Sequence, residues 1–110
     1  MNSASVRDWE NRLMDNDPKV RAIAEAAVVQ GARRSLPLLK RFLNSRNEDL
    51  HVRAFEMIQR IGPPAIPLLV GLLRYQRVSI RRSAVDALID LAPHTESTQP
   101  ALRLALTDKD

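Results

Sequence analysis

The sequence predicts an all-α protein, an α-solenoid in which about three pairs of helices stack behind an N-terminal capping helix. Apolar residues recur at helical spacing through most of its 110 residues, and similar segments recur about every thirty residues. The composition is rich in Ala, Leu, Ile and Arg and poor in aromatic residues and Gly, which favours helix over strand. We expect one domain over residues 1–110.

The N-terminal segment 5–14 is expected to form the capping helix. Val6, Trp9 and Leu13 lie at positions i, i+3 and i+7 and therefore share one helical face. Ser3 or Ser5 can cap this helix. We expect Trp9 to belong to the core, at the position that Leu39 and Leu69 hold later in the chain.

The first helical pair is expected over residues 17–46. Asp17 is a good N-cap, Pro18 suits the first helical position, and Gly31 is expected to end the helix as a left-handed cap. Ser35 can cap the second helix. The expected apolar stripes are Val20, Ile23, Ala24, Ala27 and Val28 in the first helix, and Leu36, Leu38, Leu39, Phe42 and Leu43 in the second.

Two further pairs are expected over residues 47–75 and 76–107. Asp49 is expected to open the second pair, whose first stripe contains Val52, Phe55, Ile58 and Ile61. Ala65, Ile66, Leu68, Leu69, Leu72 and Leu73 follow in its second helix. The expected core residues of the third pair are Ile80, Ala84, Ala87, Leu88 and Leu91, then Ala101, Leu102, Ala105 and Leu106.

Several independent markers support a period near thirty residues. Val20-Arg21 recurs as Val52-Arg53 and as Ile80-Arg81. The second helices share an early proline and a following leucine: Pro37, Pro67 and Pro100, then Leu39, Leu69 and Leu102. Such self-similarity is typical of a solenoid, in which each pair buries its apolar face only against its neighbours.

These segments resemble a known family. DPKVRAIAEAAVVQG with LPLLKRFL, and DLHVRAFEMIQRIG with IPLLVGLL, are similar to the short bacterial HEAT-like repeat of phycobilin-lyase-type proteins. The resemblance covers about residues 17–107. It implies the stacked fold, but it implies no ligand, because the motif residues build the stack. The third repeat departs from the motif in having Arg77-Val78 where the first has Asp17-Pro18.

No catalytic or metal-binding motif is visible, so we expect neither an enzyme nor a cofactor. The sequence has no cysteine, and His51 and His94 lie far apart without carboxylates at metal-ligand spacing. Arg21, Arg53 and Arg81 are expected to form a ladder of equivalent positions. The structural interpretation is that each binds an acidic side chain or a helix-end carbonyl in its own or a neighbouring repeat; the functional alternative is a row that binds anions.

The candidate partner-binding site lies on the non-core face of the second helices, which the resemblance places on the concave side of the stack. It consists of Lys40, Arg41, Val70, Arg74, Arg103 and Leu104. No acidic residue occurs between Glu25 and Glu48 or between Glu56 and Asp86, although each stretch contains five basic residues. This segregation of charge predicts a positive surface.

Two functions fit such a surface. The first is a protein–protein interaction scaffold or adaptor that binds an acidic or amphipathic segment of a partner. The alternative is binding of a nucleic-acid backbone, against which stand a net charge of only +4 and few aromatic residues for base stacking. A lyase-like enzymatic role follows only from the resemblance. We expect a cytoplasmic protein without a membrane span, and either self-association or docking of another chain at its C-terminal helix.

Overall fold

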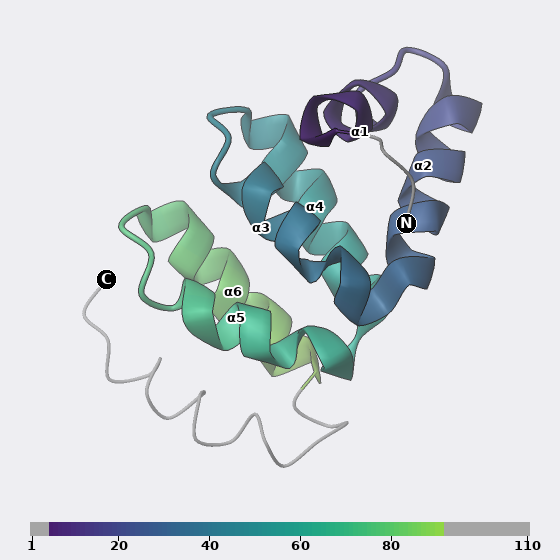
Figure 1. Cartoon of the computed structure of the whole chain (residues 1–110). Coiled ribbons are helices and arrows are strands. Elements are labelled where there is room, and N and C mark those ends of the chain that lie inside the picture. Colours follow the sequence, from purple (N-terminus) through teal and green to yellow (C-terminus); the bar gives the residue numbers. More distant parts are fainter. Residues whose placement is uncertain (1–4, 92–110) are drawn as a thin grey trace.

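A computed structural model of the chain describes residues 5–91, and these residues are helical almost throughout (Figure 1). The helices are α1 (Val6–Leu13), α2 (Pro18–Gly31), α3 (Leu36–Leu43), α4 (Glu48–Ile61), α5 (Ile66–Leu72) and α6 (Val78–Leu91). Short 3-10 turns, Ala32–Ser35 and Pro63–Ala65, lead into α3 and α5. No strand occurs in this part of the chain, and the all-α solenoid is confirmed.

The helices form two layers (Figure 1). The long helices pack side by side, α2 against α4 and α4 against α6. The short helices α1, α3 and α5 form the second layer, and each packs against the long helix that follows it in sequence. Each layer therefore covers the apolar face of the other, which neither could bury alone.

The structural period is thirty residues. The long helices start at Pro18, Glu48 and Val78, and α3 and α5 start at Leu36 and Ile66. The residues equivalent to Arg21 are therefore His51 and Arg81, whereas Arg53 is equivalent to Ile23. The predicted match of Val20-Arg21 with Val52-Arg53 is wrong, because it follows residue identity, whereas helix starts determine which positions are equivalent.

N-terminal caps determine where the long helices α2 and α4 start. The Asp17 carboxylate accepts a hydrogen bond from the backbone N–H of Lys19 at 2.9 Å. The Asn47 side chain accepts from the N–H groups of Asp49 and Leu50 at 3.0 and 3.3 Å. Asn47 is therefore the cap of α4, and the prediction that Asp49 opens this helix is wrong. A helix N-terminus has free N–H groups, which a short polar side chain just before it satisfies.

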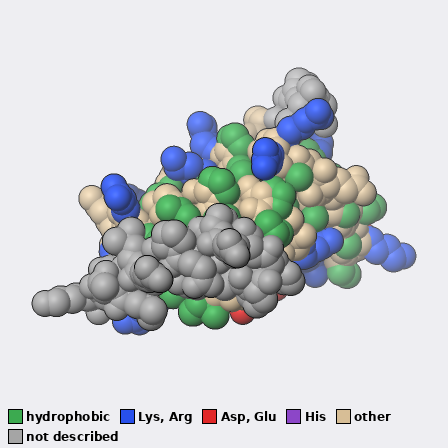
Figure 2. Space-filling view, turned by 90° about the horizontal axis from the view of Figure 1, so that it is seen from below, with side chains coloured by type: hydrophobic (Ala, Val, Ile, Leu, Met, Phe, Trp, Pro, Cys, Tyr) green, Lys and Arg blue, Asp and Glu red, His purple; other side chains and the backbone are tan. Residues whose placement is uncertain are grey.

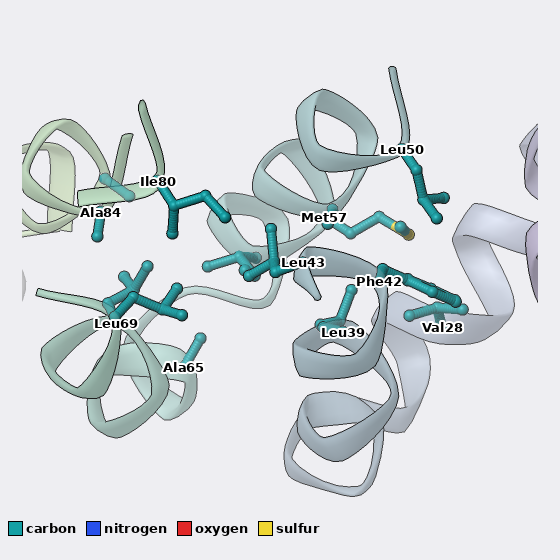
Figure 3. Packing of buried hydrophobic residues seen from close by; sticks show 14 of the residues in the cluster. Val28, Leu39, Phe42, Leu43, Leu50, Met57, Ala65, Leu69, Ile80 and Ala84 are labelled. Atoms are coloured by element: carbon teal, nitrogen blue, oxygen red, sulfur yellow. The ribbon is translucent and has the colours of Figure 1, made fainter. Parts of the chain in front are cut away.

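The core lies between the two layers (Figure 3). Leu39 of α3 and Leu69 of α5 are fully buried, and Trp9 is only 7% exposed at the equivalent position of α1. The expected core role of Trp9 is thus confirmed, whereas Leu102 lies outside the described residues. Burial of each such side chain contributes about 1.5–3 kcal/mol relative to exposure.

Two of the predicted apolar stripes differ from the buried faces. On α4, Ile58 is buried as predicted, but Val52 is 60% exposed, and the unpredicted Leu50, Ala54 and Met57 are buried. On α2, Ile23 is 72% exposed, because no long helix precedes α2 in the described part of the chain. Helical spacing alone fits more than one face of an apolar helix, so the neighbouring helices decide which face is buried.

The turn after α2 also differs from the prediction. Gly31 is right-handed (φ −67°), and Ala32 adopts the positive φ of 48°, at the position where Gly62 has 83° after α4. Gly31 allows close approach instead, since a Cβ there would collide with the Ser35 hydroxyl. That hydroxyl donates to the Val28 carbonyl at 2.6 Å and does not cap α3.

Replacing Ala32 with glycine is expected to raise the free energy of unfolding by about 1 kcal/mol, because a Cβ disfavours positive φ. Chemical denaturation monitored by circular dichroism measures this change. The matched substitution Gly62→Ala is expected to lower stability by a similar amount, since nothing lies within 4 Å of the added Cβ and only backbone strain acts. Equal stability of Ala32→Gly and the unmodified protein would contradict the strain at Ala32.

Candidate functional site

The exposed side of the second helices carries the described members of the predicted site. We call Lys40, Arg41, Val70 and Arg74 the second-helix face. Lys40 and Val70 hold equivalent positions of α3 and α5, and Arg74 lies just beyond α5. All four are exposed, Val70 by 36%. Arg103 and Leu104, the remaining members of the predicted site, lie outside the described residues.

A shallow apolar hollow of about 510 Å³ lies beside Val70. Its lining residues are Arg33, Pro63, Pro64, Ile66, Pro67 and Val70. They come from the two 3-10 turns, which contact each other, and from the start of α5. The proline rings fix the backbone φ angles, so the apolar surface around Val70 is rigid. Arg33 contributes the one guanidinium group among the lining residues.

Positive charge is unevenly distributed over the molecule. The face shown in Figure 2 carries several Lys and Arg side chains among hydrophobic ones, and its visible part has almost no Asp or Glu. The guanidinium and ammonium groups of the second-helix face take part in no ion pair within residues 5–91. Among the described residues, no ion pair has to break before these groups contact an anionic partner.

Side-chain hydrogen bonds connect the turn after α3 to the turn after α5. The Tyr75 hydroxyl donates to the Asn44 side chain at 3.0 Å, and Arg77 donates to the Ser45 carbonyl at 3.3 Å. Both contacts join the turn after α3 to the turn after α5. They fix the position of Arg74, which neighbours Tyr75, relative to α3.

Two of the ladder arginines have a structural role. Arg21 donates to the carbonyls of Asp15 and Asn16 at 2.6 and 3.2 Å. Two periods later, Arg81 makes the same contacts, donating to the carbonyls of Tyr75 and Gln76 at 2.7 and 3.1 Å. Each guanidinium satisfies backbone carbonyls of the preceding turn, as the structural interpretation predicted.

His51 occupies the equivalent position in the middle repeat. Its Nε2 lies 2.6 Å from the Ser45 carbonyl, six residues earlier, as Arg21 lies six residues after Asp15. Because a carbonyl only accepts, the histidine must donate. The sequence analysis missed this role. The capping residue could have revealed it, because Asn47 precedes His51 by the same four residues that separate Asp17 from Arg21.

Arg53 makes a different contact, between the first two long helices. Its guanidinium lies 3.3 Å from a Glu25 oxygen, and Arg60 lies 3.5 Å from the other. Arg53 therefore pairs with an acidic group of a neighbouring repeat, which the structural interpretation allowed. It is not the structural equivalent of Arg21 and Arg81, so the predicted three-membered ladder is wrong at this position.

No arrangement for metal binding is present in the part of the chain that the structure covers. Among residues 5–91, no three His, Cys, Asp or Glu side chains are grouped so that they could hold a metal ion. His94 lies beyond these residues. The described helices also include none that is long and apolar enough to cross a bilayer.

A comparison with protein families matches residues 6–89 to the family model of HEAT repeats. The match covers most of the chain and the same residues as the two-layered stack. The chain therefore belongs to the HEAT repeat family. No curated protein and no solved structure matches it.

Replacing Arg21 with methionine is expected to lower the free energy of unfolding by about 1 kcal/mol. Methionine keeps most of the apolar stem but leaves the Asp15 and Asn16 carbonyls without their charged donor. Thermal or urea denaturation measures the change. The control is Arg82→Met on the exposed surface of α6, which is expected to change stability by less than about 0.5 kcal/mol. Equal losses in the two variants would show that the carbonyl contacts contribute nothing specific.

Proposed function

We propose that the chain is a non-enzymatic scaffold or adaptor that binds an acidic or amphipathic segment of a partner protein on its second-helix face. Arg103 and Leu104 are proposed to extend this surface into the last repeat. Membership of the HEAT repeat family supports the general role, because such repeats commonly serve as protein-interaction scaffolds. The choice of face rests on the charges and the hollow described above.

One observation carries the proposal: the exposed cations of the second-helix face make no ion pair within residues 5–91, and an apolar hollow lies beside Val70 of the same face. Arg41 and Arg74 can each bind a carboxylate through two parallel hydrogen bonds, a geometry that suits guanidinium. An apolar side chain of the partner can be buried in the hollow beside Val70. Side chains buried in this way contribute most of the binding free energy in protein interfaces. An acidic segment with one apolar residue matches both features.

We also propose two finer assignments from the sequence. The absence of cysteine supports a reducing compartment and hence the cytoplasm. The Asp-Pro-x-Val-Arg start at Asp17 supports the short bacterial, phycobilin-lyase-type subgroup of HEAT-like repeats. Self-association through the C-terminal helix concerns residues outside the described part and stays a prediction.

The double variant Lys40→Glu/Arg74→Glu tests the proposed face. The unmodified protein is immobilised and its partners are captured from nuclease-treated lysate, identified by mass spectrometry, and remeasured as purified proteins. We expect the double variant to weaken binding of an authentic partner at least tenfold, because carboxylates then face carboxylates. Neither residue makes an ion pair in the described part of the chain, so the fold is expected to be unchanged.

The matched control is Lys19→Glu/Arg82→Glu, which changes the net charge equally on the exposed surface of α2 and α6. The proposal fails if both double variants lose the partner alike, or if neither does. Binding of random single-stranded RNA at low ionic strength, lost in Lys40→Glu/Arg74→Glu and weakening steeply with salt, would instead establish the nucleic-acid alternative.

A further inference from the structure

A groove of about 420 Å³ lies between α4 and α6, in the layer of long helices rather than on the second-helix face. Ile80 and the half-buried Phe55 are among its apolar lining residues, together with Val52, which is 60% exposed. The other lining residues are polar or charged: Glu48, His51, Glu56, Gln59, Ser79 and Ser83. No lysine or arginine lines it.

The equivalent space one repeat earlier, between α2 and α4, is crossed by side chains. There Glu25 of α2 binds Arg53 and Arg60 of α4 at 3.3 and 3.5 Å. These contacts occupy the space between the two helices with long side chains and neutralise the carboxylate. The first long-helix interface therefore contains an ion pair of its own.

The thirty-residue period shows why the second space stays open. Phe55 stands where the first interface has Glu25, and Ser83 stands where it has Arg53. The ion pair is thus replaced by an aromatic ring facing a hydroxymethyl group. Further along α4, the Gln59 side chain donates to the Asp90 carboxylate of α6 at 3.0 Å. A serine is far too short to reach across as Arg53 does, so the space over the Phe55 ring remains unfilled.

The rim of the groove differs in charge as well. Glu48, Val52 and Glu56 follow one another at four-residue intervals along the exposed edge of α4. Their equivalents on α2 are Pro18, Ala22 and Ala26, none of them charged. The groove therefore combines an apolar interior with two exposed carboxylates that no basic side chain of its lining neutralises. The two glutamates lie about 12 Å apart along the helix axis, given a rise of 1.5 Å per residue.

We propose that this groove is a second binding site, which takes a basic segment of a partner protein carrying one bulky apolar side chain between two cations. The apolar side chain packs on Phe55 and Val52, and lysine or arginine on either side pairs with Glu48 and Glu56. In an extended segment, cations four residues apart span about 13 Å and match the two carboxylates. The site selects charge of the opposite sign to the second-helix face, so one chain can hold two different partners.

Selection of random peptides on the full chain tests the proposal. Peptides from a displayed library are selected on the unmodified protein, and those that also bind the variant Ser83→Arg are removed. This variant places a long cationic side chain in the groove, as Arg53 does one repeat earlier. We expect the surviving peptides to carry an aromatic or branched apolar residue between basic ones. Fluorescence anisotropy then measures the affinity of each synthetic peptide.

Four variants separate the groove from other surfaces. Ser83→Arg is expected to weaken binding about tenfold or more, as filling a central pocket does. Val52→Ser, at an exposed position where folding is not at risk, is expected to weaken it several-fold. Glu48→Gln/Glu56→Gln is expected to weaken binding and to flatten its salt dependence. Gln30→Arg adds the same charge as Ser83→Arg on the exposed surface of α2 and is expected to change nothing.

The opposite results overturn the proposal. It is wrong if the selection yields no peptide that distinguishes the unmodified protein from Ser83→Arg, or if the peptides are neutral or acidic. It is also wrong if sedimentation shows a self-association that Ser83→Arg abolishes, because the occupant is then a second copy of this chain. The variant Lys40→Glu/Arg74→Glu is expected to bind the selected peptides normally, so failure here and failure of the second-helix face are distinguishable.

Discussion

The structure depends on apolar contact between short and long helices, repeated in the same register in each period. Trp9, Leu39 and Leu69 occupy one equivalent position on the short helices, and all three are buried. The short helices have only seven or eight residues and would be marginal alone, since helix nucleation is costly. Packing on the long helices stabilises them, and that contact positions both candidate binding surfaces.

The turns maintain this register with a set of polar contacts that repeats at the same period. A short polar side chain caps α2 and α4, and a donor four residues later binds a carbonyl of the preceding turn. The donor is arginine in two repeats and histidine in the middle one. Different residue types do the same task, because the backbone requires only a hydrogen-bond donor of suitable reach at that position.

Departures from the repeat distinguish the two candidate surfaces from the supporting framework. Lys40 and Val70 hold one position, and they give the second-helix face its mixture of charge and apolar surface. Glu25 and Phe55 hold another, and they make one long-helix interface closed and the other open. The core position of Trp9, Leu39 and Leu69 is apolar in every repeat, whereas these exposed or half-buried positions change from charged to apolar. The two proposed binding surfaces lie at the positions where the repeats differ.

By itself the sequence determined the helical class, the stacked fold and the burial of Trp9, Leu39 and Leu69, because local spacing of apolar residues reports helices directly. The tertiary structure alone decided which face of α4 is buried and that Ala32 rather than Gly31 takes the positive φ. It also revealed the groove between α4 and α6. These features depend on which neighbour each helix packs against, and that information is not contained in the spacing of residues along one helix.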